Sequence, residues 1–270
     1  MNIKWGKTCC IGNAATITEH AAALIISEAY AAVAEHGRFS LVVAGGDTPR
    51  QLYRHLAMGV DTDRFKHYEL KLPGREQTQW NGKITVMPWK QTWLFWGDER
   101  CVPIDNPGSN YRMVKETLLL HSPVPEDHII RMHAELPDTV LAAENYEDAI
   151  RTFFSSADIL SQENSPVFDF VLLGLGQDGH TASLFADNPD SLKEKIRWVL
   201  SVDAPHADPP GKRLTLTLPI INKAHNIAFF TSGKDKAELA AKIFNREVTG
   251  VPAALVDPEQ GNMFWFAAHP

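Results

Sequence analysis

The sequence predicts a doubly wound α/β fold, with a mainly parallel, Rossmann-like sheet and helices on both faces. Short apolar runs alternate with amphipathic helical segments along most of the 270-residue chain. Three of these runs end in glycine-rich or acidic loops, AGGDTP, GDER and GLGQDGH. Because ligands bind beyond the carboxyl ends of strands in such sheets, we expect the three loops to meet at one site. We expect residues 1–270 to form a single domain.

Periodicity and flanking residues predict the elements of the first two thirds of the chain. Apolar residues at helical spacing indicate helices, and short continuous apolar runs indicate buried strands. Thr18 and Thr48 are predicted N-caps, and Pro49 stands at a favoured first helical position. Gly37 and Gly59 are predicted to end helices. In order, these signals predict a helix over 18–36, a strand over 39–44, a helix over 49–58, a strand over 92–96, helices over 111–120 and 138–155, and a strand over 167–173.

Predicted strands and helices also alternate in the last third of the chain, whereas the segment 60–91 interrupts this alternation. A short helix is predicted to begin at Thr181. Residues 60–91 are polar and rich in turn signals, with only KITVM indicating a strand, so we predict an irregular excursion there. The remaining predicted elements are strands over 198–202, 213–218, 227–231 and 263–267 and a helix over 234–245.

Composition and charge favour a soluble, cytoplasmic protein. The net charge is −7, and the dispersed Lys and Arg residues form no basic face for nucleic acid. Three cysteines provide no disulfide framework. The N-terminus lacks the apolar core of a signal peptide, and no run approaches the length of a membrane span. We expect a monomer or a small homo-oligomer.

The loop after the strand 167–173 matches a dinucleotide-binding fingerprint only in its glycines. Gly174, Gly176 and Gly179 fit G-x-G-x-x-G. However, the carboxylate of Asp178 would repel a pyrophosphate, and the helix that follows is short. A nicotinamide-dependent dehydrogenase is therefore a weak alternative.

Acid–base catalysis explains the same loop better. Asp178 and His180 flank a glycine, so their side chains can share one side of a tight loop. Histidine is the usual general base at neutral pH, and a neighbouring carboxylate fixes its tautomer and stabilises the imidazolium. The structural alternative is that Asp178 caps a helix beginning at Thr181. No H-E-x-x-H motif or Cys/His cluster indicates a metal, and no G-x-S-x-G motif indicates a serine hydrolase.

Several blocks of the sequence resemble the 6-phosphogluconolactonase family. They are GGDTP, FWGDERCVP, SNYRMVKETLL, GLGQDGHTASLF and KRLTLTLPIIN, and they occur in the family's order over roughly residues 18–244. The resemblance implies a fold of the sugar-phosphate isomerase/deaminase type. It also implies hydrolysis of 6-phosphoglucono-1,5-lactone in the pentose phosphate pathway, without a metal or organic cofactor.

The resemblance assigns the acid–base pair to Asp178 and His180. In related deaminases a glutamate follows this histidine by five positions, where this sequence has Phe185. The replacement favours a lactonase over a deaminase. A sugar-phosphate isomerase or deaminase, and a sugar-phosphate-binding protein without catalysis, remain as alternatives.

Further residues are candidates for binding the substrate. Gly45, Gly46 and Thr48 precede a predicted helix, where backbone N–H groups bind anions such as phosphate. Arg213 and Lys236 match family positions that reach the phosphate.

The acidic loop and the glycine loop add three more candidates. Asp98 is expected to bind sugar hydroxyls, and Arg100 to contact the substrate or to pair with Glu99. Backbone N–H groups near Gly176, or Arg100, are candidates for stabilising an oxyanion. Asp47 stands where the family often has serine, which leaves its role open.

Overall fold

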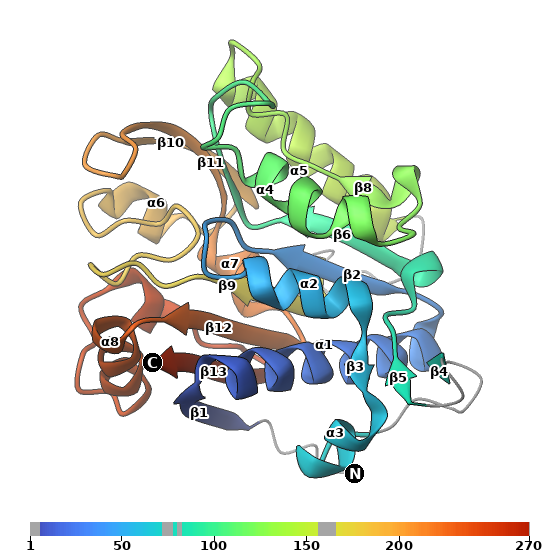
Figure 1. Ribbon diagram of the computed structural model, residues 1–270. Helices are drawn as coiled ribbons and strands as arrows, with labels where there is room; N and C mark the ends of the chain where they lie inside the picture. The colour runs from blue at the N-terminus through green and yellow to red at the C-terminus, as the bar shows by residue number, and fades with distance from the viewer. Residues whose placement is uncertain (1–5, 72–77, 80–82, 156–165, 270) are drawn as a thin grey trace.

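A parallel seven-stranded sheet forms the centre of the molecule in the computed structural model, which describes residues 6–71, 78–79, 83–155 and 166–269 (Figure 1). The strand order is β1-β13-β12-β9-β2-β6-β8, and every pairing is parallel. The predicted fold class is confirmed. The strands are β1 (Lys7–Asn13), β2 (Phe39–Val43), β6 (Thr92–Trp96), β8 (Ile129–Ile130), β9 (Phe170–Leu173), β12 (Asn226–Ser232) and β13 (Asn262–His269).

The strand order reverses between β9, the middle strand of the sheet, and its neighbour β2. From β2 the chain proceeds outward to β6 and β8, whereas from β9 it proceeds the other way to β12 and β13. Such a reversal separates the loops that follow the two strands and opens a crevice between them. The loops GGDTP and GLGQDGH follow β2 and β9, so the topology places both at this crevice.

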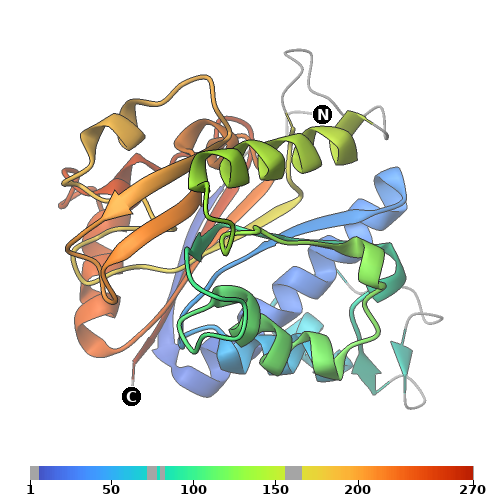
Figure 2. The ribbon, with the colours of Figure 1, turned by 90° about the horizontal axis from the view of Figure 1, so that it is seen from above.

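Helices cover both faces of the sheet, as predicted (Figure 2). Helix α5 lies on one face, while α1, α2 and α4 lie on the other. The four residues of β9 are all buried between these layers. Burial on both faces explains why its sequence is a continuous apolar run. The helices are α1 (Ala14–His36), α2 (Arg50–Met58), α3 (Thr62–His67), α4 (Asn110–Thr117), α5 (Thr139–Ser155), α6 (Pro189–Lys193), α7 (Leu218–Asn222) and α8 (Lys234–Phe244).

A second, antiparallel sheet stands beside the central one and carries part of the site. It consists of β10 (Val199–Ala204), β11 (Gly211–Leu216) and β7 (Asp98–Arg100), in that order. The segment GDER was predicted to be a loop, but its residues 98–100 pair with β11. This pairing sets Arg100 directly opposite Arg213.

The segment 60–91 contains a third small sheet rather than only irregular chain. Strands β3 (Val60–Asp61), β5 (Ile84–Thr85) and β4 (Thr78–Gln79) pair antiparallel, and α3 follows β3. Residues 72–77 and 80–82 of the predicted excursion lie outside the described residues. Figure 1 shows this sheet at the opposite side of the molecule from α6 and α8.

Three predicted local features are wrong. Helix α1 begins earlier than expected, because Asn13 caps it through Thr16 N–H, while the Thr18 hydroxyl bonds back to Ala14 O. Thr48 makes no capping bond, since a turn at Pro49 precedes α2. No helix begins at Thr181; that segment forms tight turns instead. Within the described residues, no helix has the length and apolar character that crossing a membrane requires.

Candidate active site

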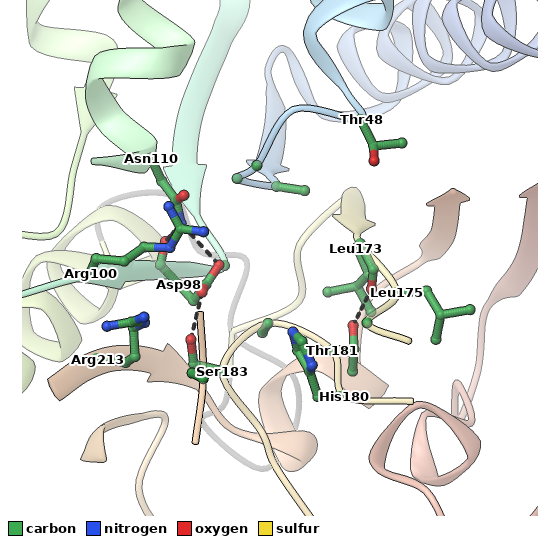
Figure 3. A pocket seen from close by; sticks show the side chains of 18 of the residues that line it. Thr48, Asp98, Arg100, Asn110, Leu173, Leu175, His180, Thr181, Ser183 and Arg213 are labelled. Carbon is green, nitrogen blue, oxygen red and sulfur yellow. Dashed lines mark hydrogen bonds between the residues drawn. The ribbon is translucent and has the colours of Figure 1, made fainter. Parts of the chain in front are cut away.

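A pocket of about 250 Å³ lies where the loops after β2, β6 and β9 meet (Figure 3). The prediction that these three loops converge is therefore confirmed. With one exception, every residue predicted to belong to the site lines the pocket. Those that line it are Gly45, Gly46, Thr48, Asp98, Arg100, Gly176, His180, Arg213 and Lys236.

Asp178 is the exception, and it lies behind His180. Its Oδ1 is 2.6 Å from His180 Nδ1 and also accepts a bond from His180 N–H at 3.1 Å. The tight loop thus places the carboxylate against Nδ1 of the imidazole and away from Nε2. No described residue hydrogen-bonds Nε2, and the imidazole itself lines the pocket. The His180 ring packs against Phe185, with ring centroids 4.6 Å apart.

The charge on Asp178 decides which nitrogen carries the proton. Burial raises the pKa of this carboxyl, but the hydrogen bonds and the positive charge that His180 can carry outweigh burial and lower the pKa. Asp178 is therefore ionised at neutral pH and can only accept hydrogen bonds. The shared proton then resides on Nδ1, which leaves the lone pair of Nε2 as a base.

Gly176 has a steric role that differs from the predicted one. Its N–H donates to His180 O at 2.9 Å, so this group is not available for an oxyanion. A Cβ at this position would lie 2.1 Å from His180 Nδ1 and 2.5 Å from Asp178 Oδ1. Only glycine therefore leaves room for the acid–base pair.

Arg100 and Arg213 give one wall of the pocket a concentrated positive charge. Arg213 is 3% exposed, and its guanidinium donates to the carbonyls of Pro209 and Lys212. Arg100 donates to Gly108 O at 2.5 Å. Neither arginine pairs with a carboxylate among the described residues. Burial, and then the charge of Arg100, lower the pKa of Arg213. Two like charges on facing strands destabilise a sheet, so this pair favours a bound anion.

The loop after β2 faces the pocket with groups that donate hydrogen bonds. Thr48 lines the pocket and its hydroxyl has no capping role. Asp47 lies at the same loop, but its side chain is 93% exposed and pairs with Arg50 Nε at 2.8 Å. The carboxylate that would repel a phosphate is thus held by a cation. Lys236, in the first turn of α8, lines the pocket and forms no ion pair with a described residue.

Glu99 has a structural role and does not pair with the side chain of Arg100. It is 3% exposed and its carboxylate receives four hydrogen bonds, three of them from residues at the start of α4. Burial raises the pKa of Glu99, and the backbone donors oppose that rise. The donors are Arg100 N, Asn110 N and Tyr111 N, each at 2.7 Å, and Ser109 Oγ at 3.1 Å.

Two residues that were not among the predicted site residues also line the pocket. Ser183 was not considered, although it lies in the same block as His180; its hydroxyl donates to Asp98 Oδ2 at 2.6 Å. Asn110 was likewise not among the predicted site residues, yet its amide donates to Asp98. Among the described residues, no group of three or more His, Cys, Asp or Glu side chains is placed to hold a metal ion.

Together, the fold and the site define an α/β protein whose pocket combines a histidine base with a cluster of cations. The chain belongs to the family of glucosamine-6-phosphate isomerases/6-phosphogluconolactonase, whose sequence model matches residues 12–265.

Individual relatives agree with this assignment. A 6-phosphogluconolactonase of Synechocystis is 32% identical over 94% of this chain and 91% of its own. The human 6-phosphogluconolactonase is 36% identical over 85% of this chain and 78% of its own. The crystal structure of 6-phosphogluconolactonase from Thermotoga maritima aligns with a TM-score of 0.73, at 26% identity, over 97% of this chain and 99% of that chain.

Proposed function

We propose that this protein hydrolyses 6-phospho-D-glucono-1,5-lactone to 6-phospho-D-gluconate, in the oxidative branch of the pentose phosphate pathway. One observation carries the proposal: His180, with Asp178 behind it, faces a pocket that also contains the cations of Arg213 and Lys236, which form no ion pair with a described residue. The histidine base can activate water for attack on an ester, and the cations can bind the phosphate of the substrate. Family membership supports the same reaction.

His180 acts as a general base and then as a general acid. Nε2 takes a proton from water as the water oxygen bonds to C1 of the lactone, and the carbonyl oxygen becomes an oxyanion. Asp178 stabilises the imidazolium that forms. When the C1–O bond of the ring breaks, the departing oxygen takes the proton from Nε2 and becomes the C5 hydroxyl. The carboxylic acid that forms at C1 then ionises.

Cations of the pocket bind the phosphate and the oxyanion. Arg213, Lys236 and the N–H groups of the loop containing Gly46 and Thr48 bind the 6-phosphate. Arg100 stabilises the oxyanion, since the N–H of Gly176 is already bonded to His180 O. Asp98 accepts hydrogen bonds from hydroxyl groups of the sugar.

The deaminase alternative conflicts with the surroundings of His180. Phe185 lies where the related deaminases have a glutamate that helps to open the sugar ring. Its phenyl ring packs on the imidazole and lines the pocket. An apolar ring in this place supplies no proton, whereas a lactone needs none there. A binding protein without catalysis would not require the hydrogen bond between Asp178 and His180 Nδ1 behind an Nε2 that no described residue engages.

The remaining features follow from the same proposal. We infer that the reaction needs no metal or organic cofactor, that residues 1–270 act as one domain, and that the enzyme works in the cytoplasm. Its partner is a small sugar-phosphate lactone, and neither nucleic acid nor membrane takes part. We further infer a monomer or small homo-oligomer.

A rapid assay on freshly made 6-phosphogluconolactone tests the proposal, because the lactone also hydrolyses without enzyme. We expect the protein to accelerate hydrolysis well above this background. In H₂¹⁸O the label should enter the carboxylate of the product and not the C5 hydroxyl. Release of ammonia from glucosamine-6-phosphate, with no effect on the lactone, would instead establish the deaminase. An Arg213→Met variant should raise KM far more than it lowers kcat, whereas the exposed Arg246→Met should change neither.

A further inference from the structure

Asp98 is held in place by two hydrogen-bond donors from distant parts of the chain. Ser183 Oγ donates to Asp98 Oδ2 at 2.6 Å, and Asn110 Nδ2 donates to Asp98 Oδ1 at 3.2 Å. Figure 3 shows the carboxylate between the two donors, with a dashed line to each. All three side chains line the pocket. Ser183 belongs to the loop of His180, so this contact ties the acid–base loop to β7.

Both donors are buried and are themselves fixed. Ser183 is 2% exposed, and its N–H donates to Thr215 Oγ1 at 3.2 Å. Asn110 is 1% exposed, and its N–H donates to Glu99 Oε1 at 2.7 Å. These two bonds fix the backbone from which each side chain extends, and burial restricts the side chains themselves. The carboxylate of Asp98 is therefore held in a single orientation.

The amide of Asn110 directs its N–H groups to Asp98 and leaves its oxygen without a hydrogen-bond donor among the described residues. Its Oδ1 is buried and has no hydrogen-bond partner among the described residues. A rotation by 180° would place this oxygen against the backbone and carboxylate oxygens of Asp98, which repel it. Gly45 makes room for the arrangement, because a Cβ there would lie 1.9 Å from Asn110 Oδ1. An unpaired buried acceptor lowers stability, and its retention here indicates a functional demand on the orientation of the amide.

The two donors leave Asp98 able to accept further hydrogen bonds. Each carboxylate oxygen has two lone pairs, and each receives one bond from the side chains of Ser183 and Asn110. Asp98 forms no ion pair within the described part of the chain. A carboxylate that is fixed and half-buried accepts bonds from neutral hydroxyl groups and repels a phosphate.

We propose that Ser183 and Asn110 are positioning residues that fix Asp98 as the acceptor for one ring hydroxyl of the sugar lactone. The inference rests on the proposed function and names the residues that set its specificity. A site built to bond a hydroxyl rejects the analogue that lacks it, because the acceptor is then left without a partner. Asp98 thereby selects polyhydroxylated lactones over deoxy lactones.

The test compares kcat/KM for 6-phosphogluconolactone with the values for its 2-deoxy, 3-deoxy and 4-deoxy derivatives. Wild type should disfavour one deoxy lactone by roughly tenfold or more, less than the 10⁴–10⁵ of a fully enclosed site because Asp98 is half-buried. Ser183→Ala should lower kcat/KM for the complete lactone and leave that deoxy lactone nearly unchanged, so that the preference falls below about threefold. Ser183→Cys, which keeps a weak donor, should give an intermediate preference.

Controls separate positioning from folding. Ser191 is equally buried, and its hydroxyl donates to Asn188 O outside the pocket, so Ser191→Ala should keep the full preference. Asn110→Asp replaces the second donor with an acceptor and should also abolish the preference, which provides the test if Ser183→Ala does not fold. A wild-type preference in a folded Ser183→Ala, or equal rates on all four lactones in wild type, overturns the proposal. If wild type hydrolyses none of the four, the proposed function itself fails.

Discussion

Strand β9 has an Asp–His pair near each end. The two pairs differ in their position relative to the pocket, in the exposure of the carboxylate and in the surroundings of the second histidine nitrogen. At the carboxyl end, Asp178 and His180 approach to 2.6 Å. At the amino end, Asp169 lies directly before the strand and approaches His36, the last residue of α1, to 2.9 Å. His180 of the first pair lines the pocket, whereas neither residue of the second pair does. An Asp–His contact alone therefore does not indicate catalysis.

The surroundings of the two carboxylates explain the difference. The Asp169 side chain is 9% exposed, and it accepts bonds from Ser40 N at 2.8 Å and Ser40 Oγ at 2.7 Å as well as from His36. The Asp178 side chain is 62% exposed. Asp169 connects the end of α1 to β2 and β9. Its carboxylate is occupied by hydrogen bonds to His36 and Ser40.

The second nitrogen of each histidine completes the comparison. His36 Nδ1 is buried and has no partner among the described residues, so water or a substrate cannot reach it. His180 has its carboxylate on Nδ1 and leaves Nε2 for the pocket. In the proposed mechanism the base needs a nitrogen that faces the substrate. His180 meets this requirement because its pocket lies beyond the carboxyl ends of the strands, where sheets of this kind bind ligands.

The largest effect is expected for Asp178→Asn. The amide keeps the shape of the side chain but removes the charge that stabilises the imidazolium, and it can donate to Nδ1 and so select the wrong tautomer. We expect kcat to fall by about 10²–10⁴. Steady-state kinetics on the lactone measures the loss. Because the side chain is 62% exposed, the melting temperature should hardly change. Asp169→Asn is the matched variant, and it should lower the melting temperature and leave kcat near that of wild type.

A smaller loss is expected for Gly176→Ala, which moves the same pair without changing its chemistry. The new methyl group would meet His180 Nδ1 at 2.1 Å, so the imidazole must shift. A displacement of about 1 Å costs on the order of 10²-fold in rate. Gly174→Ala, in the same loop but with no atom within 4 Å of the added Cβ, is the control and should retain most of kcat. Equal rates for the two variants would contradict the role given to Gly176.

The smallest effect concerns the structural pair and depends on pH. The hydrogen bond and negative charge of Asp169 raise the pKa of His36 despite its burial. A raised folded-state pKa contributes stability that is complete below the unfolded value of about 6.5 and is lost as pH rises through the folded value. We expect His36→Gln to lower the unfolding free energy by on the order of 1 kcal/mol below pH 6. Denaturant unfolding at several pH values should show that this difference shrinks as pH rises. A difference that grows with pH would refute the assignment.

The sequence predicted the strands and loops whose signals are local. Strands such as β2, β6 and β9 are buried on both faces, so an apolar run followed by a glycine or acidic loop identifies each one. The convergence of their loops followed from the geometry of parallel sheets. Most of the predicted site residues were therefore placed correctly in the pocket.

Features that depend on distant partners were not predictable in this way. Strand β1 pairs with β13 at the other end of the chain, and β7 consists of three polar or charged residues whose pairing with β11 no local pattern reveals. The contact of Ser183 with Asp98 spans 85 positions. The false cap at Thr18 has a different cause. Two residues of N-cap type, Asn13 and Thr18, compete there, and the end of β1 favours the first.

The most direct test of the account measures kcat and melting temperature for His180→Ala and His36→Ala in parallel. We predict that His180→Ala loses about 10²–10⁴ in kcat and keeps its melting temperature within about 1 °C, because the side chain is partly exposed. His36→Ala should keep kcat within about twofold and lose about 2–4 °C, as expected for roughly 1 kcal/mol in a chain of this size. A His180→Ala variant with the kcat of wild type, or a folded His36→Ala variant without turnover, would contradict the account.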